Sequence, residues 1–200
     1  MYIKLSKTRK MPCFSWGIPV SSCITGSKLV KVPGSVCSTC YANKGRSQVF
    51  PAVNLARVAR LDQWTEDREA WIVAMIAAIG TDRRFRWFDA GDVQGVGMLS
   101  DIIRVCKLTP NCLHWLPTIE RGLMGLSDFI PDNLTIRVSS PMIGIVGKGD
   151  YLKSVVVERK DKGTIPGYEC PATWIKGRKE CDDCRACWDK RVSVVIYAKH

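Results

Sequence analysis

The sequence predicts an α/β fold, either an incomplete (β/α) barrel or an open parallel sheet, flanked by cysteine-rich N- and C-terminal segments. In the middle of the chain, apolar runs of strand length alternate with stretches of helical periodicity, the pattern typical of parallel sheets. A complete eight-fold barrel needs about 250 residues, and this chain has 200. We expect an α/β domain over residues 1–160, beginning with a loop-rich wrap, and a metal-binding segment over 161–200.

Three stretches have the apolar spacing of helices that bury one face. They are 52–61, which Pro51 is placed to open, 66–80, which Gly80 ends, and 97–109. The buried face of the second helix is expected to carry Trp71, Met75 and Ile79. That of the third is expected to carry Met98, Leu99, Ile102, Ile103 and Cys106.

The strands are predicted from short runs rich in β-branched and aromatic residues. These runs are the start of 84–92, then 112–118, 133–140, 154–159 and 192–200. Between the helices they give the alternation of a parallel sheet, whose carboxyl ends are where such folds bind ligands.

The cysteine count points to metal. The basic start of the chain is followed by no apolar stretch of signal-peptide length, and no segment is long enough to span a membrane. We therefore expect a soluble protein of the cytoplasm, with no membrane partner. Because thiols stay reduced there, ten cysteines are better explained as metal or cluster ligands and core residues than as disulfides.

The chain is basic, with 30 Lys and Arg against 19 Asp and Glu and a net charge of +11. This balance favours a polyanion or a phosphate-bearing small molecule as partner, and nucleic acid is a candidate. The alternative is that part of the excess balances the negative charge of metal-bound thiolates, since the basic residues are spread along the chain.

The sharpest chemical signal lies near the C-terminus. Cys181, Cys184 and Cys187 follow one another at steps of three, and Cys170 lies upstream with Pro171 behind it. A bacterial ferredoxin sequence begins with the same spacing, so we expect an iron–sulfur cluster here. Structural zinc is the alternative, although it usually shows two separated C-x-x-C pairs.

A second set of cysteines precedes the regular elements. Cys37 and Cys40, joined by Cys23 or Cys13, are expected to form a second metal site. Four cysteines would saturate a cubic cluster, whereas three would leave one iron open to a small molecule. The remaining cysteines, Cys106 and Cys112, are interpreted as core thiols, and His114 as a core or site-lining side chain.

Polar residues follow three of the predicted strands and define a candidate cleft of mixed charge. They are Asp89, Gly91 and Asp92, then Thr118 and Glu120, and finally Arg137, Ser139 and Ser140. We expect a cofactor or substrate to contact them. Alternatives stay open: the aspartates suit a turn with Asp92 as helix N-cap, Arg137 could face solvent, and Glu120 could form a loop pair with Arg121.

Six stretches together resemble the phage Gene Product 88 family. They are 11–19, 32–45, 85–92, 114–118, 131–139 and 181–189, so the resemblance runs nearly end to end. The resemblance implies a bacteriophage protein that acts in the cytoplasm of a bacterial host, and it leaves the reaction open.

The chain is more distantly similar to radical S-adenosylmethionine enzymes. In these enzymes three cysteines hold a [4Fe-4S] cluster whose open iron binds S-adenosylmethionine, and a later glycine-rich acidic turn contacts its amino group. The resemblance implies that Cys23, Cys37 and Cys40 hold such a cluster and that the turn 89–92 contacts the cofactor. The enzymes' usual motif has three residues between its first two cysteines, whereas thirteen separate Cys23 from Cys37.

Two functional hypotheses follow. The first is a radical S-adenosylmethionine-type enzyme with one or two [4Fe-4S] clusters, the carboxyl-terminal one being auxiliary. The second is a non-catalytic protein stapled by iron–sulfur clusters or zinc, which binds nucleic acid or a host factor through exposed basic residues.

Overall fold

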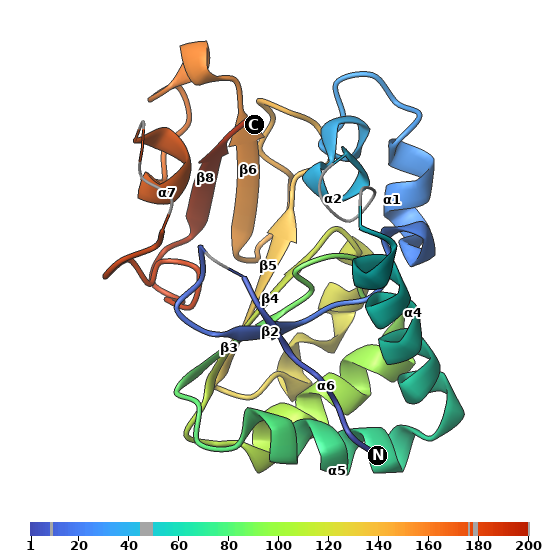
Figure 1. The fold of residues 1–200 in the computed structure, drawn as a ribbon. Helices are drawn as coiled ribbons and strands as arrows, with labels where there is room; N and C mark the ends of the chain where they lie inside the picture. The colour runs from blue at the N-terminus through green and yellow to red at the C-terminus, as the bar shows by residue number, and fades with distance from the viewer. Residues whose placement is uncertain (9, 45–49, 176, 178–179, 200) are drawn as a thin grey trace.

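A computed structural model describes residues 1–200 except 9, 45–49, 176, 178–179 and 200 (Figure 1). The described chain forms an eight-stranded sheet in the order β1-β2-β3-β4-β5-β6-β8-β7. Neighbouring strands are parallel throughout, except that β1 is antiparallel to β2. The strands are β1 (Ser6–Lys7), β2 (Phe14–Trp16), β3 (Arg84–Trp87), β4 (Leu113–Thr118), β5 (Leu134–Ser139), β6 (Lys153–Val157), β7 (Tyr168–Glu169) and β8 (Val194–Ala198).

The sheet is open. From β2 to β6 the strands lie side by side in chain order, as in a (β/α) barrel, but the sheet ends at β1 and β7 and does not close. Of the two architectures that the sequence predicts, the open parallel sheet is the one observed. All five predicted strands are present, although residue 200 lies outside the described part of the chain.

The predicted helices cover one face of the sheet (Figure 1). They are α4 (Pro51–Glu66), α5 (Arg68–Ile79) and α6 (Val96–Leu108). Pro51 opens α4 and Gly80, with a φ of 54°, ends α5, as predicted. Their apolar faces pack on Phe85 and Trp87 of β3 within the main core, and the predicted buried residues of α5 and α6 all belong to it.

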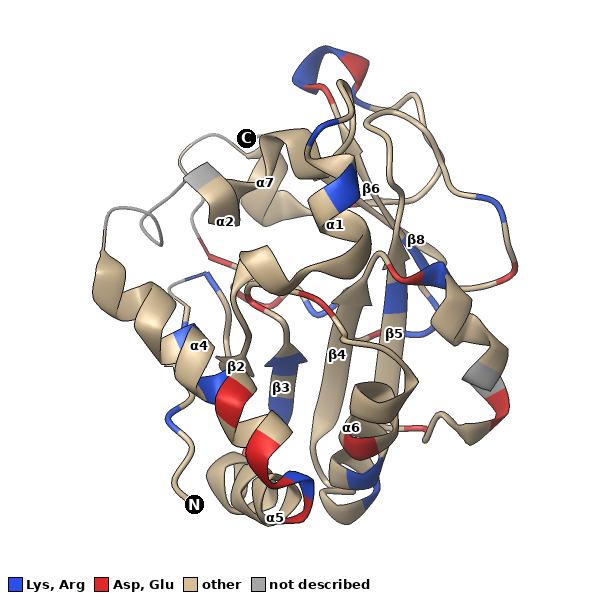
Figure 2. Cartoon of the chain, turned by 90° about the vertical axis from the view of Figure 1, so that its right-hand side faces the viewer, with Lys and Arg blue, Asp and Glu red and all other residues tan. Residues whose placement is uncertain are grey.

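Shorter helices lie mainly in the connections that the sequence predicts as loops. They are α1 (Ile24–Leu29), α2 (Tyr41–Lys44), α7 (Pro171–Trp174) and the 3-10 segments Val20–Ser22, Cys37–Thr39, Arg121–Phe129 and Arg159–Asp161. In Figure 2 the strands β3 and β5 point upward, so α1 and α2 lie above the carboxyl ends of the sheet. Among the described residues, none of the helices is long and apolar enough to cross a membrane.

The second face of the sheet carries the carboxyl-terminal segment. Trp115 of β4 packs there against Trp188, with ring centroids 5.4 Å apart, in a cluster that also contains Cys170 and Cys187. Trp188 also donates a hydrogen bond from its indole nitrogen to the carbonyl of Phe85, at 3.0 Å. The part of the carboxyl-terminal segment around Cys170, Cys187 and Trp188 therefore packs on the face opposite the helices.

The expectation of cysteine-rich segments that merely flank the sheet is not confirmed. The amino-terminal segment, described to residue 44, contributes β1 and β2, and the carboxyl-terminal one contributes β7 and β8. The stretch that carries Cys13 continues directly into β2. Phe14–Trp16 pairs in parallel with Phe85–Trp87, so the short strand depends on a partner about seventy residues away.

Gly17 lets β2 run close beside the end of β3. A Cβ on Gly17 would lie 2.7 Å from the carbonyl oxygen of Ala90 and would also overlap a carboxylate oxygen of Asp89. We expect Gly17→Ala to lower the free energy of unfolding by about 1–3 kcal/mol, because backbone must move to relieve the overlap. Gly122→Ala is the control, since a Cβ there meets nothing within 4 Å. Equal urea midpoints for the two variants would refute this expectation.

Candidate functional site

Three cysteines lie in the connection that follows β2, and we call Cys23, Cys37 and Cys40 the amino-terminal thiol set. Cys23 precedes the first residue of α1, and a single 3-10 turn, in which the Cys40 amide donates to the Cys37 carbonyl at 3.2 Å, joins the other two. Gly26 leaves a space between them. A Cβ on Gly26 would lie 3.6 Å from the Sγ atoms of both Cys23 and Cys37.

Side-chain hydrogen bonds fasten this connection to the carboxyl ends of β3 and β4. Both carboxylate oxygens of Glu120 accept from Thr25, one from its amide at 2.9 Å and one from its hydroxyl at 2.7 Å. The hydroxyl of Tyr41, the residue after Cys40, donates to the carbonyl of Asp89 at 2.6 Å. The Glu120 carboxylate therefore binds Thr25, and the alternative of a loop pair with Arg121 does not describe it.

Asp92 joins the ends of the same two strands. It is buried, and its carboxylate accepts from the amides of Val93 at 2.7 Å and Ile119 at 2.8 Å. Burial raises the pKa of Asp92 to about 6, although these hydrogen bonds act in the opposite direction. The alternative of a helix N-cap is wrong, because α6 begins at Val96 and Gly95 precedes it without a side-chain cap.

The amino-terminal thiol set is surrounded by negative charge. Burial, with the charges of Asp92, Glu120 and the other two thiols acting in the same direction, raises the pKa of the Cys23 thiol to about 12. Burial likewise raises the pKa of Cys37 to about 11, with Cys40, Asp92 and Glu120 acting in the same direction. The thiols of Cys23 and Cys37 therefore stay protonated unless a cation binds beside them, which is the electrostatic condition of a metal site.

Asp89 and Gly91 have positions fixed by packing. Asp89 is buried with one carboxylate oxygen 3.4 Å from an Nη of Arg57, and its other oxygen has no hydrogen-bond partner among the described residues. Gly91 has a φ of 77°, and a Cβ there would lie 2.7 Å from the carbonyl oxygen of Ile18. Close contact between the connections after β2 and β3 thus requires glycine at this position.

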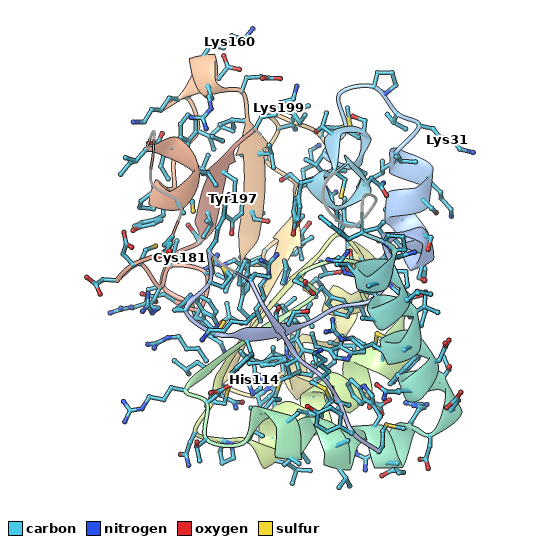
Figure 3. All side chains as sticks on the ribbon, in the orientation of Figure 1. Lys31, His114, Lys160, Cys181, Tyr197 and Lys199 are labelled. Carbon is cyan, nitrogen blue, oxygen red and sulfur yellow. The ribbon has the colours of Figure 1, made fainter. Side chains whose placement is uncertain are left out.

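The other predicted ligands lie on the second face of the sheet, and we call Cys13, Cys170, Cys181, Cys184 and Cys187 the carboxyl-terminal thiol set. Cys13 belongs to it because the charge of Cys181 acts on its thiol and because it packs with Cys170 and Cys187. Polar neighbours contact the sulfurs: the Tyr168 hydroxyl lies 3.4 Å from Cys184, and that of Tyr197 lies 3.2 Å from Cys187. Figure 3 shows Cys181 and Tyr197 beside β8, away from Lys31 in the connection after α1.

Arginines accompany the carboxyl-terminal thiol set. Burial raises the pKa of Cys187 to about 12, whereas the charges of Arg137 and Arg86 lower it. Burial also raises the pKa of Cys13 to about 12, again against the charges of Arg86 and Arg185. The two thiol sets therefore differ: carboxylates act on the first, and guanidinium groups partly offset the negative charge of the second.

Arg137 organises the loop that carries Cys187. The residue is fully buried on β5, and its guanidinium donates to the carbonyls of Ala186, Cys187, Asp189 and Val192 at 2.7 to 3.1 Å. The alternative of a solvent-facing side chain is wrong. Strand alternation alone cannot show this, because the covering segment comes from fifty residues later in the chain.

The functional hypotheses did not include Arg86, which lies between the two thiol sets. An Nη lies 3.5 Å from the Tyr41 hydroxyl, the guanidinium stands 4.8 Å over the Trp115 ring, and the buried Nε has no hydrogen-bond partner among the described residues. The alternation of β3 could have indicated this position, because Phe85 and Trp87 face the helices.

The predicted core residues are confirmed as such. Cys106 and Cys112 are buried in the main core. His114 is fully buried, lies 2.9 Å from the Thr109 hydroxyl and stacks on Trp87. Burial lowers the pKa of His114 to about 4, so the ring is neutral at physiological pH.

As placed, neither thiol set forms a finished metal centre. All ten cysteines are free thiols. In the described part of the chain, no three or more cysteine, histidine, aspartate or glutamate side chains are arranged so that they could hold a metal ion. The structure therefore shows which residues and charges surround the thiols of each set.

A family model described as Gene product 88 matches residues 4–190. The chain belongs to the phage Gene product 88 family. Both thiol sets and every predicted strand-end residue lie within the matched range. Neither a search of curated proteins nor a search of solved structures returned a match.

The raised pKa of Asp92 predicts how the stability of the metal-free chain changes with pH. The folded carboxyl keeps its proton up to about pH 6, whereas an aspartate in the unfolded chain releases it near pH 4. The unfolded chain thus loses its proton first, and stability falls as the pH rises through this interval, by about 3 kcal/mol. Asp92→Asn should lack this part of the pH dependence in urea unfolding. An unchanged slope in the variant would contradict the prediction.

Proposed function

We propose that this protein is an iron–sulfur enzyme of the radical S-adenosylmethionine type, with the amino-terminal thiol set as the ligands of its reactive cluster. The observation that carries the proposal is the composition of that set. It gathers three cysteines above the carboxyl ends of parallel strands, while Cys13, the other candidate ligand, lies with the carboxyl-terminal thiol set. Three thiolates are the number that leaves one iron of a cubic cluster open.

The donor set fits such a cluster in its chemistry. Thiolates are the ligands that iron–sulfur clusters use, and a Cβ on Gly26 would lie 3.6 Å from the sulfurs of both Cys23 and Cys37, so these two thiols adjoin the same glycine. The excess negative charge of the set is relieved when iron binds, since the ligands are then deprotonated by the metal. Binding requires the three thiol side chains to turn toward a common centre.

The acidic neighbours suit a cationic ligand. When bound, a reduced cluster with an open iron supplies an electron to the sulfonium of S-adenosylmethionine. Asp92 and Glu120 would attract the positively charged groups of such a ligand, because an ionised carboxylate has about four acceptor sites and each already uses only part of its capacity. Tyr41 and Glu120 hold the connection in place at this edge of the sheet.

The carboxyl-terminal thiol set favours a second metal site, either an auxiliary cluster or structural zinc. Its sulfurs lie in an apolar cluster with Trp115 and Trp188, as in a closed site that stabilises the fold. If Cys13 instead completes a four-cysteine site with Cys23, Cys37 and Cys40, and the other four cysteines form a second closed site, the alternative of a non-catalytic, metal-stapled protein replaces the enzyme.

Anaerobic reconstitution tests the proposal. The full chain, purified without oxygen, is loaded with iron and sulfide, analysed for iron, sulfide and zinc, reduced and mixed with S-adenosylmethionine. We expect iron and sulfide for at least one four-iron cluster, an electron paramagnetic resonance signal that changes on addition of the cofactor, and release of 5′-deoxyadenosine. The enzyme proposal would be refuted if the spectrum of the fully loaded protein did not change on addition of S-adenosylmethionine. It would also be refuted if the chain retained zinc alone.

A further inference from the structure

Two adjoining hollows lie at the amino-terminal edge of the sheet, the edge opposite the amino-terminal thiol set. The larger, of about 710 Å³, lies between the turn that ends α5 and the turn that ends α6. The smaller, of about 230 Å³, lies between the β1–β2 region and Arg185 of the carboxyl-terminal segment. Both are lined by Asp82, Arg83 and Arg84, so the two hollows adjoin at these residues, and together we call them the edge groove.

The charge of the edge groove is strongly positive. Four cations line it, namely Lys7, Arg83, Arg84 and Arg185, against the single carboxylate of Asp82. Four arginines elsewhere form ion pairs: Arg57 with Asp89, Arg68 with Asp101, Arg104 with Glu69 and Arg191 with Asp189. Among the described residues, no such ion pair joins the four groove cations to a carboxylate.

Two of these side chains have unused hydrogen-bonding capacity or exposure that suits an anion. The Nε of Arg84 is buried without a hydrogen-bond partner in the described structure. Arg83 is exposed at the lip of both hollows. Guanidinium groups recognise phosphate through paired N–H donors, and a hollow with unpaired cations concentrates the local field.

The larger hollow adds surfaces of another kind. Ile76, Leu108 and Leu113 supply apolar wall, and Thr109 and Asn111 supply polar groups. A ligand with an anionic part and a flat, partly apolar part would match the groove along its length. A nucleoside phosphate has both parts, with its phosphate toward the arginines and its base toward the leucines.

We propose that the edge groove binds nucleoside phosphates, either as a free nucleotide or as part of a single nucleic-acid strand. Because the groove lies at the opposite edge from the amino-terminal thiol set, this inference does not rest on the reactive cluster proposed there; the smaller hollow is lined by Cys13 of the carboxyl-terminal thiol set. It also gives a location to part of the excess positive charge that the sequence shows.

The test uses the full chain and two probes, fluorescein-labelled single-stranded DNA in anisotropy titrations and AMP in calorimetry. The test variant is Lys7→Ala with Arg83→Ala, both exposed side chains. The control variant is Lys31→Ala with Lys160→Ala, which removes the same charge from exposed positions at the far end of the molecule (Figure 3). Thermal unfolding of each variant verifies that it remains folded.

We expect the test variant to bind at least about tenfold more weakly at low salt, with a salt dependence shallower by about one to two in the log–log slope. The control variant should change affinity by less than about twofold. Binding of the strand without displacement by AMP identifies nucleic acid as the ligand, and saturable binding of AMP identifies a free nucleotide. Equal losses in both variants, or no binding of either probe by the parent chain, would overturn the proposal.

Discussion

Arg137→Met is expected to lower the free energy of unfolding by about 3–5 kcal/mol, because it removes the charged donor of a fully buried side chain from four backbone carbonyls. The guanidinium satisfies four backbone carbonyls of the loop 186–192. Methionine preserves much of the apolar length of the side chain but offers no donor. The carbonyls of Ala186 and Asp189 also accept from the backbone amides of Asp189 and Val192, so the loss falls mainly on the carbonyls of Cys187 and Val192. Urea unfolding followed by tryptophan fluorescence measures the change.

Arg104→Ala provides the matched control for a lost arginine. Arg104 pairs with Glu69 on the outside of the molecule, and both side chains are largely exposed. Because solvent screens such a pair, this variant should unfold at nearly the parent urea concentration. If Arg137→Met also leaves the midpoint unchanged, water or a rearranged loop satisfies the four carbonyls, and Arg137 does not organise the Cys187 loop.

The helices and most strands of this fold could be predicted because their signals are local. In α5, Trp71, Met75 and Ile79 recur at the spacing of one helical face, and the glycine that ends the helix follows them directly. The five predicted strands are apolar runs that would be buried in almost any α/β arrangement. Local pattern and tertiary packing agree in these elements.

The missed elements have no local signal. β2 is three residues long and exists because Phe14–Trp16 can pair with Phe85–Trp87 and because Gly17 and Gly91 allow close approach. β1 and β7 have two residues each. Such strands are set by the partner's position, which sequence periodicity does not contain.

In the candidate site, too, the features set by local sequence could be predicted and those set by distant contacts could not. The spacing of Cys37 and Cys40 follows from sequence, because a single turn joins them. The sequence did not show whether Cys13 or Cys23 lies with Cys37 and Cys40. That depends on the fold, in which Cys13 precedes β2 and lies near Cys181, whereas Cys23 follows β2. Arg137 was placed on the correct strand, but its neighbours come from a segment that only the folded chain brings there.

Cys37→Ala is expected to abolish release of 5′-deoxyadenosine from the reconstituted protein and to lower its iron and sulfide content by about half. The reason is the composition of the amino-terminal thiol set. With three thiolates, loss of one leaves two ligands, too few to hold a cubic cluster. The carboxyl-terminal thiol set lies on the other face of the sheet, so any metal that it binds in the parent chain is expected to remain in this variant.

Two further variants make this prediction sharp. Cys112→Ala removes a buried core thiol and should retain both the iron content and the cleavage. Cys13→Ala separates the two sets, because Cys13 lies with Cys181: it should leave the cofactor-dependent spectral change intact. If Cys13→Ala removes that change as fully as Cys37→Ala does, Cys13 closes the reactive cluster as a fourth ligand. The open iron, and with it the enzyme, would then be excluded, and a closed structural or electron-transfer site would take its place.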